Sequence, residues 1–258
     1  MTDAIHGRFV WYELMTTDPT AAKAFYPPVI GWSTKAYPSP DMAYTLWMRG
    51  ETGIGGLMAL PDDARKMGAP PHWLAYVGTD DIAATTARAT QLGAKAIVPP
   101  TAIPDVGTFA ILADPQGAAF ALLQPISQER TPDAPPALGD FSWHELATTD
   151  YKAAFAFYKT LFGWEETGQH DMGPLGIYFM FGRGGRTLGA LFNKPAQMPG
   201  PPHWLLYARV ADAHKAATSV KALGGQVLNG PMEVPGGDWI AQCADPQGAM
   251  FAVHQTKA

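Results

Sequence analysis

The sequence predicts an α+β protein made of two tandem copies of one domain, with two strand–helix–three-strand (βαβββ) units in each copy. Three observations predict this fold class. A ten-residue stretch occurs twice, as FVWYELMTTD at residues 9–18 and as FSWHELATTD at residues 141–150. The two halves align along the chain at an offset of 132 residues near the start and 131 near the end. Within each half, short alternating apolar runs surround two segments with helical periodicity.

Each opening stretch has the pattern of a strand that ends at Thr-Thr-Asp. Alternation places one set of side chains of the first copy on one face, namely Phe9, Trp11, Glu13 and Met15. The opposite face takes Val10, Tyr12 and Leu14. A tryptophan and a carboxylate on one face are unusual for a plain core. Each opening strand is therefore expected to line a pocket.

A helix is predicted directly after each opening strand. Asp18 is the expected N-cap of the first helix, with Pro19 at its first position, and Asp150 is the N-cap in the second copy. The apolar stripes at helical spacing are Ala22, Phe25, Tyr26 and Val29 in the first helix and Ala154, Phe157, Tyr158 and Leu161 in the second. A Gly-Trp pair follows each helix.

The remaining segments also recur in order. Strands are predicted at residues 42–48 and 53–60, with counterparts at 177–181 and 187–193, and another strand begins at each PPHW, at 70–77 and 201–208. Second helices end at glycines, and an ADPQGA turn at 113–118 and 244–249 precedes each last strand. The proline-rich segment 127–139 is the expected linker. The predicted domains are residues 1–126 and 140–258.

Composition limits the function classes. The chain has 258 residues, 47% hydrophobic and 16% charged, which is typical of an ordered globular protein. The net charge of −5 is scattered, which argues against nucleic acid or an anionic membrane as partner. The first residues contain no signal-peptide hydrophobic region, and the single Cys243 excludes an intrachain disulfide and a cysteine-based zinc site. We expect a cytoplasmic monomer or homodimer whose partner is a small molecule.

The repeated motifs resemble the vicinal oxygen chelate superfamily, which includes glyoxalase I, bleomycin-resistance proteins, extradiol dioxygenases and fosfomycin-resistance enzymes. The resemblance rests on the Thr-Asp…Ala-Phe-Tyr…Gly-Trp opening and on the ADPQGA turn, both present in each half. It is nearest to the tandem-domain, antigen-like or hydroxylase-like branch. It implies that two βαβββ units form a curved, mostly antiparallel sheet around a concave pocket, with helices outside. Neighbouring units can share a domain, or units can swap across the chain or a dimer.

The resemblance also implies a divalent metal held by His, Glu or Gln on the first, fourth, fifth and eighth strands of a domain. The first, fifth and eighth positions fall on Trp11, Leu74 and Ala121 in one half and on Trp143, Leu205 and Ala252 in the other. The fourth strands, 53–60 and 187–194, contain no carboxylate or imidazole. A zinc, nickel or iron site needs at least three donors in fixed geometry. Both sites are therefore expected to be degenerate, and no cofactor is predicted.

A displaced metal site in the second domain is the alternative. Glu145, His203 and His254 each lie two residues from a family ligand position, and two histidines with a carboxylate can hold non-haem iron. The cofactor would then be a divalent iron, zinc, nickel or manganese ion. A two-residue step moves a side chain by roughly 6.5 Å, so the shifted ligands need not converge. The first half offers only Glu13 and His72.

Glu13 with His72, and Glu145 with His203, are also candidates for acid–base pairs across each pocket, because a carboxylate raises the basicity of a neighbouring imidazole. The structural alternative is that each PPHW segment is a strand entry whose imidazole binds the backbone. A carboxylate within an apolar strand costs several kcal/mol of desolvation unless it is paired or wet, so both glutamates indicate a polar cavity.

Aromatic side chains are the candidate ligand contacts. Those expected to stack on a planar ligand are Trp11, Trp143, Tyr76 and Tyr207. Arg209, on the predicted face of Tyr207, is a candidate contact for an anionic ligand or a solvated edge charge. His144 is interpreted as packing, and Cys243 has no neighbouring base in the sequence that would make it a nucleophile.

These observations predict a glyoxalase/bleomycin-resistance-like protein that binds a small aromatic or apolar molecule without a metal. The alternative is a lyase, isomerase or oxygenase of glyoxalase or dioxygenase type that uses Glu145, His203 and His254. A third possibility is an interaction scaffold whose pockets are filled by the aromatic side chains.

Overall fold

A computed structural model describes residues 5–38, 43–127 and 134–257 of the chain. The first half contains β1 (Phe9–Thr16), α1 (Pro19–Ile30), β2 (Ser33–Tyr37), β3 (Tyr44–Arg49), β4 (Thr52–Ala59), α2 (Asp62–Lys66), β5 (His72–Gly78), α3 (Ile82–Gln91), β6 (Lys95–Ile103), β7 (Gly107–Ala113) and β8 (Ala119–Pro125). The second half contains β9 (Phe141–Thr148), α4 (Tyr151–Phe162), β10 (Glu165–Asp171), the short 3₁₀ helix η1 (Gly173–Leu175), β11 (Ile177–Arg183), β12 (Arg186–Asn193), β13 (His203–Arg209), α5 (Ala213–Ala222), β14 (Gln226–Glu233), β15 (Trp239–Ala244) and β16 (Met250–Gln255).

The strands form two eight-stranded mixed sheets with the same order. The first runs β2-β3-β4-β1-β5-β8-β7-β6 and the second β10-β11-β12-β9-β13-β16-β15-β14. Parallel pairs join β1 to β4, β5 to β8, β9 to β12 and β13 to β16. The other strand pairs of each βαβββ unit are antiparallel. The expected α+β class with two βαβββ units in each sheet is confirmed.

Contacts group the chain into two compact units that do not coincide with its halves. Unit 1 comprises the described residues of 1–10, 75–134 and 144–204, and unit 2 comprises those of 11–74, 135–143 and 205–258. Unit 2 therefore combines most of the first βαβββ unit with most of the fourth, and unit 1 combines the second with the third. Neighbouring βαβββ units share a sheet, whereas the compact units join βαβββ units from different halves.

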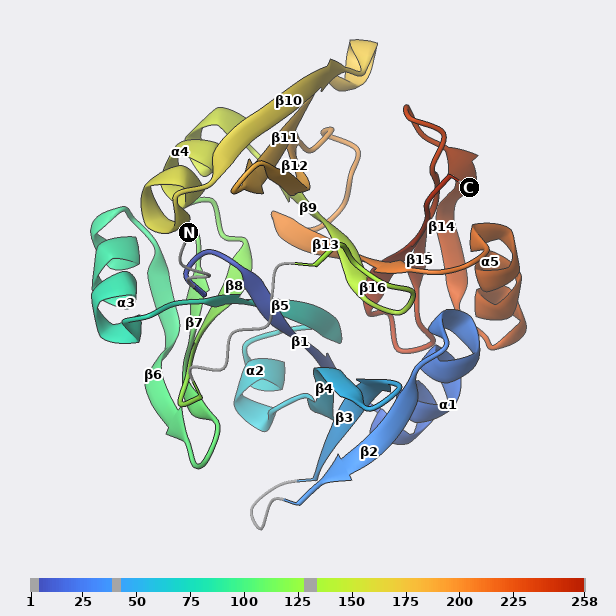
Figure 1. The fold of residues 1–258 in the computed structure, drawn as a ribbon, viewed down its shortest axis with the longest axis horizontal. Helices are drawn as coiled ribbons and strands as arrows, with labels where there is room; N and C mark the ends of the chain where they lie inside the picture. The colour runs from blue at the N-terminus through green and yellow to red at the C-terminus, as the bar shows by residue number, and fades with distance from the viewer. Residues whose placement is uncertain (1–4, 39–42, 128–133, 258) are drawn as a thin grey trace. The chain divides into compact units, whose positions relative to one another are not determined.

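In unit 2, α1 lies beside α5 although the two helices are far apart in the sequence (Figure 1). Asp18 caps α1, because its Oδ1 accepts the N–H groups of Thr20 and Ala21 at 3.0 and 2.9 Å. On the buried side of this helix, the Tyr26 hydroxyl donates to Asp245 Oδ2 at 3.0 Å and accepts from Trp73 Nε1 at 2.9 Å. The tyrosine belongs to the first half and the aspartate to the ADPQGA turn of the second.

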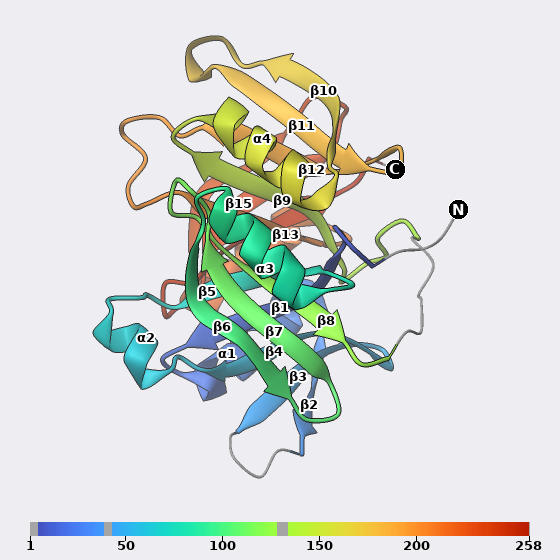
Figure 2. The same ribbon diagram turned by 90° about the vertical axis from the view of Figure 1, so that its left-hand side faces the viewer.

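Unit 1 repeats this arrangement, with α3 beside α4 (Figure 2). Asp150 caps α4 through the N–H groups of two following residues. The Tyr158 hydroxyl donates to Asp114 Oδ2 at 3.0 Å, and Trp204 Nε1 donates to the same hydroxyl at 3.2 Å. All the predicted stripe residues of α1 and α4 are buried.

The elements differ from the sequence-based prediction in several places. The short α2 was not predicted and falls in the polar connector before β5. Leu223 has the helical spacing of the apolar residues of α5, but it follows the helix as its C-cap residue and is 39% exposed. Residue 42, the predicted start of one strand, and residues 128–133 of the predicted linker lie outside the described residues. Within the described ranges, no helix is long and apolar enough to cross a membrane.

Candidate ligand-binding site

One face of unit 2 carries an apolar cluster, which we call the β13–β16 cluster. Leu205, Tyr207 and Ala252 are buried, and the partly buried Trp143 and Ile240 pack against them. The parallel register places Tyr207 of β13 directly beside Ala252 of β16, so both side chains lie on the same face. The hydroxyl end of Tyr207 accepts a hydrogen bond from Gln242 Nε2 at 2.8 Å. The cluster thus combines an apolar surface with a polar edge.

Three members of the cluster stand where the family resemblance places metal ligands. They are Trp143 at the first-strand position, Leu205 at the fifth and Ala252 at the eighth. The structure brings these positions together, but indole, isobutyl and methyl groups provide no lone pair for a metal ion. Among the residues described here, no group of three or more His, Cys, Asp or Glu side chains could hold a metal. The side chains at these positions do not fit the family metal.

A second polar group in unit 2 is built around Glu13. Tyr44 Oη donates to Glu13 Oε1 at 2.8 Å and accepts from Trp11 Nε1 at 3.1 Å. Glu13 is buried. The burial of the Tyr44 hydroxyl, together with the negative charge of Glu13, raises the pKa of this hydroxyl above the ordinary value. The tyrosine therefore stays protonated and remains a donor to the carboxylate. Trp11 and Glu13 lie in one hydrogen-bonded chain, as expected if they share a face.

Gly56 leaves the space that Tyr44 occupies. It stands opposite Glu13 in the parallel β1–β4 pair, and a Cβ atom added at Gly56 would overlap the Tyr44 hydroxyl. We expect Gly56→Ala to displace Tyr44 from Glu13 and to lower the free energy of unfolding by about 1–3 kcal/mol, since the partly buried ring has to move. Urea denaturation measures the loss. Gly53→Ala on the same strand is the matched control, because its Cβ would have no neighbour nearer than 3.7 Å; equal losses in both variants would contradict the expectation.

Unit 1 holds the corresponding carboxylate–tyrosine pair. Tyr178 Oη donates to Glu145 Oε2 at 2.8 Å, and Glu145 is buried. Ala190 stands opposite Glu145 in the β9–β12 register, where Gly56 stands in the other half. Tyr76, another candidate contact, is buried beside Ala121 in the β5–β8 register. Both glutamates predicted from the sequence are thus paired with a tyrosine.

The two histidines of the PPHW segments have the backbone contacts that the structural alternative predicts. His72 Nδ1 lies 2.7 Å from the carbonyl oxygen of Pro70, and His203 Nδ1 lies 3.0 Å from that of Pro201. In both cases the partner of Nδ1 is the backbone carbonyl of the proline two residues earlier, and not a glutamate. The acid–base role of these histidines stays a hypothesis.

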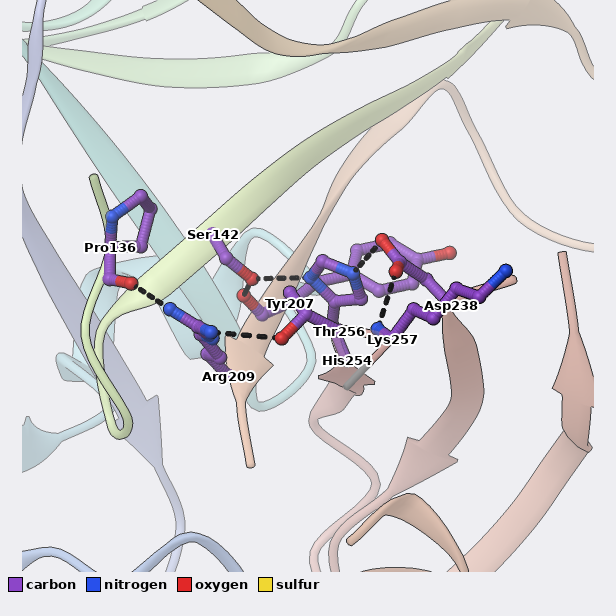
Figure 3. Close-up of polar contacts among 8 residues, drawn as sticks. All are labelled: Pro136, Ser142, Tyr207, Arg209, Asp238, His254, Thr256 and Lys257. Atoms are coloured by element: carbon purple, nitrogen blue, oxygen red, sulfur yellow. Dashed lines mark hydrogen bonds and ion pairs between the residues drawn. The ribbon is translucent and has the colours of Figure 1, made fainter. Parts of the chain in front are cut away.

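His254, the third residue of the alternative metal site, lies in a polar network at the ends of β13 and β16 (Figure 3). Its Nδ1 is 2.8 Å from Ser142 Oγ, and its Nε2 is 2.9 Å from Asp238 Oδ2. Arg209 stands beside His254 in the register and donates to Thr256 Oγ1 at 2.8 Å and to the carbonyl of Pro136. Both imidazole nitrogens of His254 therefore have protein partners.

Ser142 and Asp238, the two residues that contact the His254 imidazole, were not predicted. Strict alternation along β9 would separate Ser142 from Trp143, yet both reach the face that carries His254 and Ala252. Asp238 precedes β15 in a turn, and no local pattern marks it as a partner of a residue 16 positions later. The polar triplet Ser, Asp, His gave no sequence signal because its members lie far apart in the chain.

His144 and Cys243 agree with their sequence-based interpretation. His144 is buried, stacks on Phe9 with ring centroids 3.7 Å apart and places Nδ1 2.8 Å from the Leu188 carbonyl. Cys243 is buried, and burial raises the pKa of its thiol to about 12. A thiol with such a pKa is a poor nucleophile near neutral pH.

Comparison with known proteins identifies the family. Residues 8–122 and 141–253 each match the Glyoxalase/Bleomycin resistance protein/Dioxygenase superfamily. The protein belongs to this superfamily and contains two tandem glyoxalase domains.

Relatives and solved structures agree with this assignment. The proposed glyoxylase CFP32 of Mycobacterium tuberculosis is 31% identical over 246 residues, which covers 94% of this chain and 92% of the relative. The anthracycline biosynthesis protein DnrV of Streptomyces peucetius is 29% identical, with 100% and 96% covered. The Mn(II)-bound glyoxalase from Novosphingobium aromaticivorans superposes with a TM-score of 0.63 at 17% identity, covering 98% of this chain and 82% of that one. The 2,3-dioxygenase LapB from Pseudomonas sp. KL28 gives 0.65 at 12% identity, covering 99% and 94%. At these low sequence identities, the two superpositions show only that this chain shares its fold with those proteins.

Proposed function

We propose that the protein binds a small aromatic or apolar molecule against the β13–β16 cluster and does so without a metal ion. The observation that carries the proposal is the gathering of Trp143, Leu205 and Ala252 at the three positions where the family places ligands. Partly buried Trp143 and Ile240 offer apolar surface, and an indole ring stacks well on a planar ligand. The name of the relative DnrV, an anthracycline biosynthesis protein, is in keeping with an aromatic ligand.

The polar edge of the cluster supports an oriented ligand. Gln242 holds the Tyr207 hydroxyl at 2.8 Å, so the phenol ring has a fixed position and its amide partner stands at the border of the apolar surface. Small-molecule sites usually combine apolar walls with a few placed polar groups. A ligand with an aromatic body and one hydrogen-bonding substituent matches this composition.

Removing the indole of Trp143 tests the proposal. We expect Trp143→Ala to weaken binding of planar aromatic compounds by roughly tenfold or more, because an aromatic stacking contact contributes about 0.5–1.5 kcal/mol beyond its buried area. Titration calorimetry with a panel of mono- to tetracyclic aromatics measures the effect. Trp239→Ala is the control, since Trp239 packs on His214 with centroids 4.6 Å apart. Unchanged affinity in Trp143→Ala, or failure of every compound to bind the wild-type protein, would refute the proposal.

The competing candidate is a metal-dependent lyase, isomerase or oxygenase, which the description of the relative CFP32 as a proposed glyoxylase favours. Elemental analysis of protein purified without chelators or an affinity tag separates the two candidates. About one iron, zinc, nickel or manganese per chain that is lost in Glu145→Ala and His203→Ala would replace the binding proposal with the enzyme. Metal far below one per chain, unchanged in both variants, would support a metal-free site.

A further inference from the structure

The hydrogen-bond partners in the Ser142–His254–Asp238 network indicate which atoms carry the protons. Each oxygen of the Asp238 carboxyl group faces a nitrogen, as expected of a carboxylate that only accepts. Its Oδ1 accepts the Lys257 backbone N–H at 2.8 Å. Its Oδ2 faces His254 Nε2 at 2.9 Å, which must carry a proton to make this hydrogen bond.

The proton on Nε2 decides the role of Ser142. In the neutral imidazole, Nδ1 is then an acceptor, and the Ser142 hydroxyl 2.8 Å away is the donor. Among the described residues, the only other acceptor within hydrogen-bond distance of this hydroxyl is the Tyr207 carbonyl, at a longer 3.4 Å. A hydroxyl that donates to an imidazole, with the imidazole oriented by a carboxylate, is the arrangement that activates a serine nucleophile.

The first half of the protein shows that the fold does not need this network. The repeat places Val10 at the position of Ser142, Gly107 at that of Asp238 and Leu123 at that of His254. The same strands β1, β7 and β8 form there without any of the three polar groups. Gly78 and Pro125 likewise stand in place of Arg209 and Thr256. The five residues of the network are thus specific to the second half, and an architectural role alone does not account for them.

We propose that Ser142 is an activated nucleophile that accepts the acyl group of a small ester. Its Oγ forms a bond to the ester carbonyl carbon while its proton passes to His254 Nδ1. The tetrahedral intermediate collapses by breaking the bond to the alcohol oxygen, which takes the proton from His254. Water then attacks the acyl-serine, gives a proton to His254 and releases the carboxylic acid, and the proton returns to Ser142 Oγ.

The surroundings indicate the kind of ester. Ser142 is partly exposed, and the His254 and Asp238 side chains are 13% and 35% exposed, so the network is open to small molecules. The next residue is Trp143 of the β13–β16 cluster, which offers an apolar surface to an aryl or alkyl group. Arg209 Nε is buried and has no hydrogen-bond partner among the described residues. Its positive charge, on the face that carries His254, would favour a developing oxyanion.

Covalent labelling with a small alkyl fluorophosphonate tests the proposal. The phosphorus takes the place of the ester carbonyl, Oγ displaces fluoride, and the serine remains phosphonylated. We expect the wild-type protein to gain one label, which peptide mass spectrometry places on Ser142. Ser142→Ala should abolish labelling, and Asp238→Asn should slow it at least tenfold at unchanged Tm. Ser33→Ala, at an exposed position of β2, is the control and should label at the wild-type rate.

Mapping the label in the wild-type protein keeps the test independent of how the variants fold. Absence of label after prolonged incubation, or label on another residue, would overturn the proposal. The small reagent does not need the aromatic surface, so its outcome is separate from that of the ligand-binding test. Hydrolysis of p-nitrophenyl acetate with a burst of one nitrophenol per chain, lost in Ser142→Ala, would further support an acyl-serine.

Discussion

Replacing Asp114 with alanine is expected to lower the free energy of unfolding by about 3–5 kcal/mol, because two buried donors and one partly buried donor lose their acceptor at a cost of about 1–3 kcal/mol each, not fully additive. Oδ1 accepts the N–H groups of Gln116 and Ala118, both at 2.9 Å, and Oδ2 accepts the Tyr158 hydroxyl at 3.0 Å. Asp114 is 3% exposed, so water cannot replace these partners without opening the turn. The loss would approach the whole stability of a marginal domain.

Urea denaturation followed by tryptophan fluorescence measures this effect. Asp245→Ala should behave alike in unit 2, since its carboxylate accepts the N–H groups of Gln247 and Ala249 and the Tyr26 hydroxyl at 2.8–3.0 Å. Tyr158→Phe leaves the two backbone hydrogen bonds of Asp114 in place but removes those of the hydroxyl to Asp114 and Trp204, and it should cost about 1–3 kcal/mol. Asp62→Ala, in an exposed pair with Arg65, is the surface control. A loss below about 1 kcal/mol in Asp114→Ala would contradict the expectation.

The ADPQGA turn shows how far the sequence predicts this fold. Local rules predicted the turn, the N-caps Asp18 and Asp150 and the buried stripes of α1 and α4, because each depends on neighbours a few residues away. The partner of the turn is not local. Asp245 binds Tyr26 of the other half, and this contact depends on which helix lies over which strands. Alternation and helical periodicity carry no information about that choice.

The candidate site divides in the same way. The resemblance located Trp143, Leu205 and Ala252, and their gathering in one cluster depends only on strand order and register. Glu13 and Glu145 were also identified, but their tyrosine partners come from β3 and β11. These partners could not be predicted, because the sequence does not show which residues of neighbouring strands stand opposite each other. Ser142 was missed because strict alternation assigns it to the wrong face.

Acidification should expose a second large effect, which centres on His144. Burial lowers the pKa of this imidazole to about 4, and the nearby charge of Arg186 acts in the same direction, although the Leu188 carbonyl partly opposes them. In the unfolded chain the imidazole titrates at about 6.5. Between these values the unfolded state binds a proton that the folded state does not, so the folded state loses stability as the pH falls. This stabilisation is fully present above the unfolded pKa, and the loss reaches about 3 kcal/mol at pH 4, at 1.36 kcal/mol per pKa unit.

Comparing His144→Gln with the wild-type protein isolates this term from the rest of the titration. Burial raises the pKa of the Asp114 and Asp245 carboxyls, so these two groups act in the opposite sense and favour the folded state as the pH falls. The pH dependence of wild-type stability therefore contains contributions of both signs, whereas the His144→Gln variant removes only the contribution of His144. We expect urea denaturation at pH 7 and pH 4.5 to show a drop in the wild-type protein that exceeds the drop in His144→Gln by about 2–3 kcal/mol. His170→Gln, at an exposed position of β10, should keep the wild-type dependence. Equal losses of stability in the wild-type protein and in His144→Gln would contradict this expectation, because they would mean that folding does not lower the pKa of the His144 imidazole.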